Sequence, residues 1–580
     1  METDVYSQKC IGGKRMRKYL LLSLMSVLVL VLAACADDSD VDEDAAGDNG
    51  DDGEAATEES ASGDIVVAMQ DDAVSLDPHG SNDSASSQVR QNIYESLVQQ
   101  DADMELVPGL AEEWEAVEED IWNLTLREGT TFHSGEEFTA EDVKATFDRV
   151  RDEAVASEVA FLFEMIEEVE VVGDYEVNLH TEYPFAPLPS HLAHNTGGIM
   201  SKALIDEDYQ NALDEADVDM TADEYYELRE EGGDEYEDVM EQISEDLGSV
   251  ISSNPDGTNH GMLEERNPGQ ETVLTKFEDF QGGERNFDTV TFRVIPEVSA
   301  RLAELETGGI QVARDIDASN AQRVQEGDNT ELLEQESLRT DYLGFNTQKE
   351  PFDDEKVRQA IALAIDTEAI VDGVYDGMGI SATHPIPPDV WGYDDSLEGT
   401  EYDLERAQEL LAESDHPDGF STELWVRDDQ MIVDTALYIQ ESLSELNIDV
   451  QVEQMEWGAF LDRTGQGDQE MYLLGWTTVT ADADYGLYAL HHSDNFGAVG
   501  NRSFYANDDL DEALDNGRTE SDEDARAEAY STAQQIIIEE APIAPIVHSN
   551  FSIGVDTSQV DGIELDALGD VRLENVTFNE

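Results

Sequence analysis

Cysteine is nearly absent from this chain, which has only Cys10 and Cys35 among its 580 residues. Basic residues are also scarce: 30 Lys and Arg face 136 Asp and Glu, which gives a formal net charge of −106. The apolar run at 20–34 is too short to span a membrane comfortably. These shortages argue against a disulfide framework and against nucleic-acid binding, because so negative a field repels phosphate.

The first 35 residues have the pattern of a secretory signal. Basic residues at 14–18 precede the apolar run at 20–34, and small residues precede Cys35. The segment LAAC at 32–35 resembles the lipobox of bacterial lipoproteins. That resemblance implies cleavage before Cys35, lipidation of its thiol, and anchoring to the extracytoplasmic face of the cell membrane. A plain secretory signal is the alternative.

The acidic residues are spread along the chain together with 40% hydrophobic residues. At about 1 M salt the screening length falls to about 3 Å, so we interpret the charge as an adaptation to a salty exterior. A calcium-binding surface protein is an alternative.

Residues 36–62 carry twelve acids and no base, which predicts a disordered tether. Residues 206–249 carry nineteen acids, yet Thr221 and Glu224 form a capping-box pattern that predicts a helical insertion.

The remaining sequence alternates between strand and helix patterns, which predicts an α/β fold. DIVVAMQ at 64–70 reads as a buried strand, and Thr139 is the expected N-cap of a helix that buries Val143, Phe147 and Val150. QVRQNIYESLV at 88–98 has helical spacing. No internal repeat is evident.

Several motifs in order resemble one family, the family 5 solute-binding proteins that serve ABC importers of peptides and nickel. The resemblance covers residues 64–580 apart from the insertion, and these segments carry it: NIYESLVQQDADMELVPGLAEEWE, WNLTLREGTTFHSGEEFTAEDVKATFDRV, FRVIPEVSARLAELETG, YLGFNTQKEPFDDEKVRQAIALAID, HPIPPDVWGYD and NRSFYANDDLDEALDNG.

The resemblance implies a periplasmic-binding-protein type II fold, in which two α/β lobes close about a hinge and an extra subdomain decorates the first lobe. It implies a monomer without cofactor that captures a small peptide-like solute for an ABC permease and ATPase complex. The expected boundaries are lobe I at 63–310, with the extra subdomain at about 96–196 and the insertion at about 206–250, lobe II at 311–540, and a return to lobe I at 541–580.

The segment YLLGWTTVTADADYGLYALHHSDN at 472–495 is the expected ligand site. In peptide receptors of the family, an acidic residue shortly after Gly-Trp binds the ligand's amino group, but Val479 stands there. The pattern is similar to receptors assigned to glutathione, with Asp482 or Asp484 left to pair with the ammonium. We expect Trp476 to pack on the ligand and Thr477, Thr478 and Thr480 to supply hydroxyls. Alternatively, Trp476 belongs to the core and both aspartates cap a helix beginning near Asp484.

Carboxylates on the ligand would need arginine, which grips them bidentately. Arg502 and Arg339 are the candidates, with Arg90 weaker, and a surface ion pair is the alternative for each. In this fold, the loop after the first strand would bring three further contacts to the cleft: Ser81, Asn82 and Asp83.

Other functions find less support in the sequence. Nickel binding stays open because of the pairs His191/His194 and His491/His492, but adjacent histidines on a strand point in opposite directions and no HExxH motif is present. A secreted hydrolase is the alternative of another class, yet the chain has no GxSxG or GxxxxGK motif. Glutathione is therefore the favoured ligand, followed by di- or oligopeptides and then nickel.

Overall fold

The computed structural model describes residues 63–102, 104–157, 159–283, 285–497 and 500–579. The predicted signal segment, Cys35 and the tether at 36–62 lie outside these residues. Within the described ranges, no helix combines the length and apolar character needed to cross a bilayer.

A long mixed sheet runs through both lobes, in the order β16-β15-β17-β13-β18-β11-β1-β10-β9-β8. Its lobe I half pairs β1 in parallel with β10 and β11. The strands of this half are β1 (Asp64–Met69), β8 (Gly261–Asn267), β9 (Glu271–Lys276), β10 (Thr289–Val294), β11 (Val312–Ala313) and β12 (Thr330–Glu336). The lobe II half contains β13 (Arg339–Phe345), β14 (Gly379–Ser381), β15 (Ser421–Arg427), β16 (Asp449–Met455) and β17 (Met471–Thr477).

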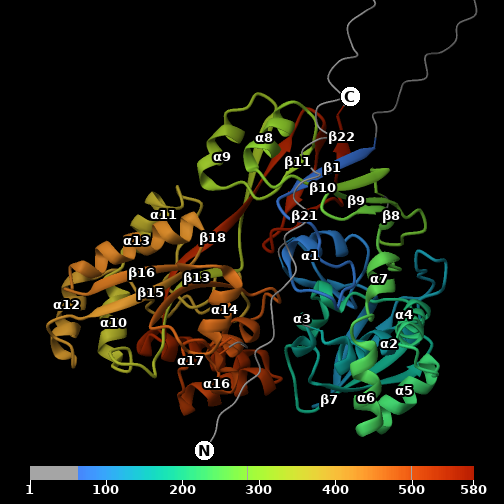
Figure 1. The fold of residues 1–580 in the computed structure, drawn as a ribbon, viewed down its shortest axis with the longest axis horizontal. Helices are drawn as coiled ribbons and strands as arrows, with labels where there is room; N and C mark the ends of the chain where they lie inside the picture. The colour runs from blue at the N-terminus through green and yellow to red at the C-terminus, as the bar shows by residue number, and fades with distance from the viewer. Residues whose placement is uncertain (1–62, 103, 158, 284, 498–499, 580) are drawn as a thin grey trace, which may run out of the picture. The chain divides into compact units, whose positions relative to one another are not determined.

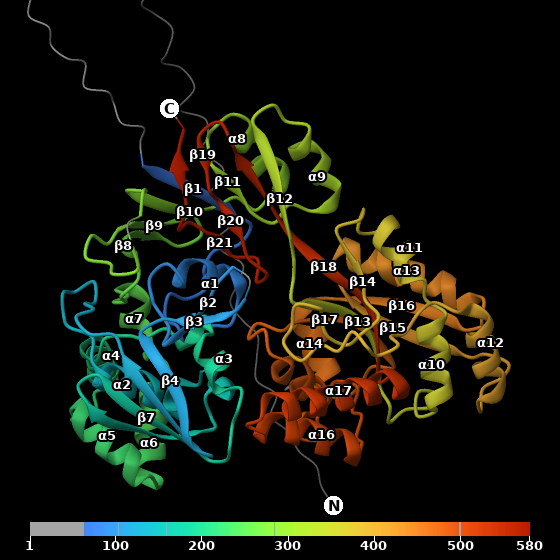
Figure 2. The same cartoon turned by 180° about the vertical axis from the view of Figure 1, so that it is seen from behind.

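The strand β18 (Ile543–Asp556) belongs to both halves (Figures 1 and 2). Its first part, from Ile543 to Val547, pairs with β13, and its later part, from Asn550 to Asp556, pairs with β12. The chain therefore crosses between the lobes along β18 and along the short link between β12 and β13. β11 pairs with β1 and β12 pairs with the later part of β18, so the strand pairing favours a crossing near Leu338 over the expected boundary at 311. In the sequence, neither the two-residue strand β11 nor the amphipathic helix at Ala318–Gln325 shows which sheet it joins.

A separate four-stranded sheet, β4-β5-β7-β6, forms the extra subdomain of lobe I. Thr139 begins α2 with a capping box to Asp142, as predicted. The core of this subdomain includes Phe132, Phe147 and Phe163 among many aliphatic side chains, and Tyr485 of lobe II packs into the same cluster. The elements are β4 (Ala111–Glu118), β5 (Ile121–Leu126), α2 (Ala140–Val150), β6 (Ile166–Gly173), β7 (Glu176–Thr181) and α3 (Leu188–Leu192).

The acidic segment forms helices, with the predicted capping box between Thr221 and Glu224. These are α4 (Lys202–Glu215), α5 (Ala222–Glu231), α6 (Asp234–Ile243) and α7 (Ser249–Ser253). They dock on a single buried carboxylate, Asp152, which accepts hydrogen bonds from the hydroxyls of Tyr209, Tyr225 and Tyr236 at 2.6, 3.2 and 2.9 Å. Arg229 pairs with the same carboxylate at 3.1 Å. The insertion is thus pinned to the lobe through its aromatic face, while most of its acids face water and Asp208 is buried beside Arg149.

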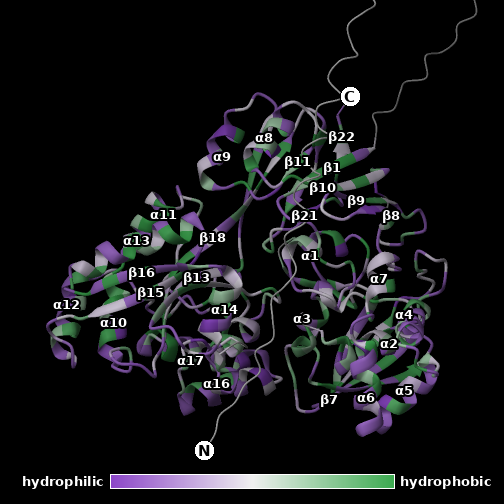
Figure 3. Ribbon diagram, in the orientation of Figure 1, coloured by the Kyte–Doolittle hydropathy of each residue, from purple (hydrophilic) through white to green (hydrophobic). Residues whose placement is uncertain are grey.

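Helices cover the rest of the sheet, and hydrophilic residues are spread over the helices of both lobes (Figure 3). Lobe I carries α1 (Ser84–Arg90), α8 (Val298–Glu306) and α9 (Ala318–Gln325). Lobe II carries α10 (Glu355–Leu363), α11 (Thr367–Gly373), α12 (Leu404–Glu413), α13 (Gln430–Ser444), α14 (Trp457–Gly465), α15 (Ala489–His491), α16 (Asp508–Thr519) and α17 (Glu523–Glu540). Short two-stranded sheets complete the fold: β2 (Val98–Gln100) with β3 (Leu106–Pro108), β19 (Val560–Asp561) with β22 (Thr577–Phe578), and β20 (Glu564–Leu565) with β21 (Val571–Arg572).

Candidate ligand-binding cleft between the lobes

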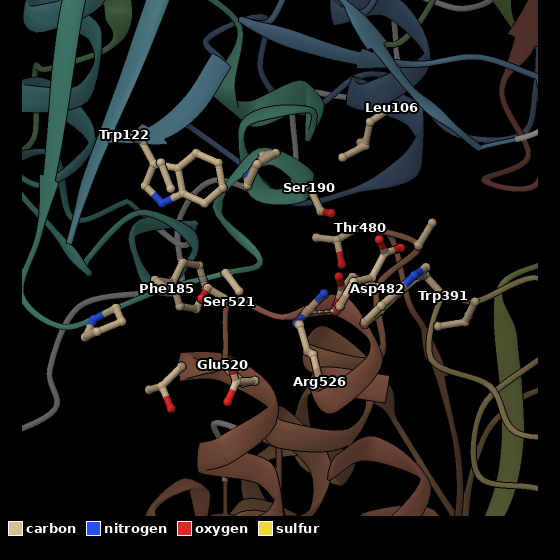
Figure 4. A pocket seen from close by; sticks show the side chains of 18 of the residues that line it. Leu106, Trp122, Phe185, Ser190, Trp391, Thr480, Asp482, Glu520, Ser521 and Arg526 are labelled. Carbon is tan, nitrogen blue, oxygen red and sulfur yellow. Dashed lines mark hydrogen bonds and ion pairs between the residues drawn. The ribbon is translucent and has the colours of Figure 1, made fainter. Parts of the chain in front are cut away.

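A cleft of about 1250 Å³, here called the main cleft, separates the extra subdomain from lobe II. Trp122, Phe185 and Ser190 stand on one wall, and Thr480 and Asp482 stand on the facing wall (Figure 4). Among the described residues its lining is strongly acidic, with Arg526 as the one base; the acids are Glu105, Glu118, Glu119, Asp389, Asp482, Glu520 and Glu523.

The loop after β17 positions the lobe II wall. Beyond Thr477, the backbone N–H of Thr478 donates to the carbonyl of Leu338 at 2.8 Å, which continues the pairing with β13. Ala481 then takes a left-handed conformation with φ of 55° and pairs with Trp391. This turn brings Thr480 to the cleft, where its carbonyl accepts a hydrogen bond from Gln100 of lobe I at 3.0 Å. The Thr480 hydroxyl oxygen is buried without a hydrogen-bond partner among the described residues.

The two predicted ammonium-binding aspartates already have internal cationic partners. Arg526 donates to Oδ1 of Asp482 at 2.6 Å, and Arg518 grips both oxygens of Asp484 at 2.9 and 3.2 Å. Burial by itself would raise the pKa of Asp484, but the Arg518 guanidinium holds that pKa well below its ordinary value. Because the carboxylate of Asp484 is buried and paired with Arg518, its position fits the structural alternative better than contact with the ligand's ammonium. Asp482 does line the cleft, through a carboxylate that is already shared with Arg526.

The helix expected near Asp484 is present as a π-helical turn from Asp484 to Tyr488. Asp482 accepts from the backbone N–H of Asp484 at 2.9 Å, which fits the capping alternative for Asp482. His191 of α3 lies 3.7 Å from Asp484, and the backbone N–H of Ala186 donates to the carbonyl of Arg518 at 2.9 Å. Asp484 and Arg518 therefore help to hold lobe II against the extra subdomain.

Three other predicted contacts on β17 and its loop lie behind the main cleft rather than on its surface. Trp476 packs against Tyr485, with ring centroids 5.3 Å apart, and joins the apolar clusters on both sides of it. Thr477 pairs with Arg339 in the sheet, and Thr478 is buried. These positions fit the core alternative better than ligand contact.

The polar residues in the loop after β1 also have structural roles. Ser81 accepts hydrogen bonds from Arg90 through both its carbonyl and its hydroxyl, at 2.9 and 3.2 Å. Asp83 is the N-cap of α1 and accepts from the backbone N–H of Ser86 at 2.8 Å. Asn82 interacts with the hydroxyl of Tyr485 in lobe II. None of the three lines the main cleft, and Asn82 alone reaches across to the other lobe.

The predicted arginines divide between two places. Arg502 donates to the hydroxyl of Thr464 at 3.1 Å inside lobe II, and Arg90 is fully buried. Arg339 pairs with Asp341 at 2.8 Å and lines a second interlobe cavity of about 550 Å³. This second cavity is here called the hinge groove, because Ser549 to Ile553 of β18 form part of it. The sequence did not identify Arg314 or Arg427, which line the same groove.

The histidine pairs do not form a metal site. His191 binds the carbonyl of Leu162 through Nδ1 at 2.8 Å, and His194 binds the hydroxyl of Thr196 at 2.7 Å. Burial lowers the pKa of His491 to about 3, so this imidazole is neutral. Within the described residues, no three His, Cys, Asp or Glu side chains are grouped closely enough to hold a metal ion.

Comparison with known proteins identifies the family. The model of "Bacterial extracellular solute-binding proteins, family 5 Middle" matches residues 105–498. The dipeptide-binding protein of Escherichia coli K12 is 29% identical over 497 residues, which cover 82% of this chain and 86% of that protein. The glutathione-binding protein GsiB of Shigella flexneri is 30% identical over 496 residues, which cover 84% and 89% of the two chains.

A solved structure gives the same result for the fold. The periplasmic binding protein DppA of Helicobacter pylori, in complex with the peptide STSA, superposes with a TM-score of 0.71 at 28% identity, covering 89% of this chain and 99% of the other. This confirms the predicted type II binding-protein fold with two lobes. Proteins of this kind work with ABC permease and ATPase components as extracytoplasmic receptors and are not enzymes. The chain belongs to the family 5 bacterial extracellular solute-binding proteins.

Proposed function

We propose that this protein is the lipid-anchored receptor of an ABC importer, which captures a small peptide-like solute between its lobes and delivers it unaltered to the permease. The observation that carries the proposal is the main cleft, which separates two lobes built as in peptide-binding relatives. Closure of such lobes about a hinge buries the ligand and creates the surface that a permease recognises.

Within the main cleft, Thr480 and Asp482 are the proposed ligand contacts. The buried Thr480 hydroxyl has no partner among the described residues, and a buried polar group without a hydrogen bond is costly. A ligand amide or ammonium at this point would satisfy it. The other predicted contacts support these two from behind: Trp476, Thr477 and Thr478 fix the strand end from which the loop begins.

Glutathione is the favoured solute, since GsiB is among the relatives and the segment after Gly475 has the pattern of such receptors. A longer peptide is the second candidate. The volume of the main cleft favours it, because about 1250 Å³ exceeds the 300–1000 Å³ typical of small-molecule sites.

Calorimetric titration in molar salt separates these candidates. The purified protein would be titrated with glutathione, dipeptides, tetrapeptides and a nickel–histidine complex, with the solutes recovered afterwards and analysed for turnover. Stoichiometric binding of glutathione or a peptide without turnover is the expected result. Thr480→Val should weaken that binding about tenfold. Thr532→Val, on the exposed side of α17, is the matched control. Conversion of a bound peptide to product would refute the receptor role.

A further inference from the structure

An unusual element of lobe II meets the extra subdomain of lobe I. Asp484 to Tyr488 form a π-helical turn, a rare structure that occurs frequently at functional sites. The turn follows Ala481, whose backbone is left-handed. Tyr485 in this turn is 7% exposed, and its side chain belongs to the apolar cluster that forms the core of the extra subdomain. A side chain of lobe II is therefore buried against side chains of the other lobe.

Aromatic stacking joins Tyr485 to the extra subdomain. Its ring is stacked on that of Phe161, with the ring centroids 6.1 Å apart and an interplanar angle of 24°. The side chain of Phe161 is partly exposed, so it contributes less to the core of its own subdomain than the buried rings do. The hydroxyl of Tyr485 also interacts with Asn82 of lobe I. The ring and the hydroxyl of Tyr485 therefore both have partners in lobe I.

A second contact between the lobes is made by Arg518 of lobe II. The backbone N–H of Ala186 in lobe I donates to the carbonyl of Arg518 at 2.9 Å. The Arg518 guanidinium lies 5.1 Å from the ring centroid of Phe185 in lobe I and 3.6 Å from that of Tyr488 in lobe II. Both oxygens of Asp484 hold the guanidinium in this place. A cation over aromatic faces is stabilised most where water is excluded, and the Arg518 side chain is mostly buried.

These two contacts border the main cleft. Phe185 of lobe I lines the cleft, and so does Thr519, the residue that follows Arg518 in lobe II. Phe161 and Tyr485 are not among the described residues that line it. A substitution at Phe161 or Tyr485 can therefore affect a solute in the main cleft only through the arrangement of the two lobes.

We propose that the extra subdomain and the π-helical turn form a latch, made of Phe161 and Phe185 of lobe I with Tyr485 and Arg518 of lobe II, which holds the lobes together and slows release of the solute. The inference rests on the proposed receptor function and gives the extra subdomain a role in it. Every group in the latch belongs to the protein, so the latch stabilises this arrangement of the lobes with or without a solute. A solute leaves when the lobes separate, and separation breaks the latch, so a weaker latch raises the population of the open state.

A double-mutant cycle across the latch tests this role. Phe161→Ala and Tyr485→Leu each remove the stacked ring pair, so each should speed release of glutathione, or of a tetrapeptide if glutathione does not bind, about fivefold in stopped-flow measurements. The double variant should release the solute no faster than Tyr485→Leu alone, because both changes break the same contact. Val172→Ala, at an exposed position on β6 of the same subdomain, is the matched control. X-ray scattering without solute should give a larger radius of gyration for the latch variants than for this control.

The outcomes separate this inference from the proposed function. If Phe161→Ala releases the solute at the rate of the Val172→Ala control, the latch is refuted while the receptor role stands. Effects of the two single variants that multiply in the double variant would also refute it, because the rings would then act independently. If Tyr485→Leu does not fold, Phe161→Ala still decides, since its side chain is 37% exposed. If no offered solute binds the parent, the peptide receptor fails, and the radius of gyration alone decides for or against the latch.

Discussion

The guanidinium of Arg526 in α17 lies 2.6 Å from Oδ1 of Asp482, a residue forty-four positions earlier in the sequence. The same guanidinium lies over the ring of Trp391, 4.2 Å from the ring centroid. This arrangement joins three separate segments of lobe II at the edge of the main cleft. A carboxylate that the sequence offers as a ligand contact is therefore first a structural counter-ion for Arg526. Its remaining role toward a solute depends on the oxygen that Arg526 does not use.

Replacing Asp484 should damage stability much more than ligand binding. Asp484→Asn leaves Arg518 without its bidentate partner in a nearly closed environment, so the free energy of unfolding should fall by about 3 kcal/mol. Denaturant unfolding in molar salt would measure the loss. Asp494→Asn, whose side chain is 85% exposed, should change the free energy of unfolding very little. A tenfold loss of ligand affinity in Asp484→Asn, with unchanged stability, would restore Asp484 as a ligand contact.

Asp570 should make stability depend on pH. Burial, together with the charge of Asp566, raises the pKa of Asp570 to about 7, above the value of 3.8 for an unperturbed aspartate. Between these two pKa values the folded protein binds more protons than the unfolded chain, so this group's contribution to stability falls as pH rises from 4 to 7 and is constant above that.

Melting curves from pH 4 to pH 8 would test this effect. The melting temperature of the parent minus that of the Asp570→Asn variant should decrease as the pH rises. Buried histidines contribute to stability with the opposite pH dependence, and the subtraction removes their contribution. Burial lowers the pKa of His260, for example, to about 3. Asp561→Asn, at an exposed position of the same C-terminal segment, should give a flat difference curve. A flat curve for Asp570→Asn as well would show that Asp570 is ionised throughout.

Asp152 should control whether the acidic insertion stays docked. Asp152→Ala leaves the buried hydroxyls of Tyr209 and Tyr225, the half-buried hydroxyl of Tyr236, and Arg229 without their shared acceptor, and each buried group left unsatisfied costs about 1–3 kcal/mol. Hydrogen exchange of α5 and α6 should accelerate, while ligand affinity stays the same because the insertion does not line either cleft. Asp238→Ala on the exposed face of α6 is the control. Unchanged exchange in the Asp152 variant would contradict the pinning role.

Salt should stabilise the fold through screening. Raising KCl from about 0.1 M to about 1 M shortens the screening length from about 10 Å to about 3 Å, which suppresses repulsion among acids in a chain of net charge −106. The melting temperature should rise steeply over this range and then level off. A neutral osmolyte such as sucrose controls for stabilisation by exclusion from the surface. An equal rise with sucrose would show that screening is not the cause.

The local patterns in the sequence predicted much of the fold, because they depend on neighbouring residues. The strand at Asp64–Met69 and the helices that begin after Thr139 and Thr221 follow from alternation and capping. The helix expected at 88–98 instead spans Ser84–Arg90 and ends before Ile93. Its N-cap, Asp83, was overlooked because the serine-rich segment reads as a loop.

The partners of the site residues could not be predicted in this way. Arg518 and Arg526 reach Asp484 and Asp482 across 34 and 44 positions, and no spacing rule connects them. The same holds for the hinge groove, where Arg314 and Arg427 come from different lobes. Charge in so acidic a chain indicates function only when the fold shows which bases gather at one place.

One strand, β18, pairs with both lobes, and this restricts how the protein can move. The central residues of β18 pair with β14, where Ser549 lies opposite Gly379. The hydroxyl of Ser337 also donates to the carbonyl of Ser549. Neither lobe can rotate without twisting the few residues between Val547 and Asn550, so the pivot of the motion is set by the backbone itself. Rotation of one lobe relative to the other should therefore be concentrated at this short segment and at the link between β12 and β13.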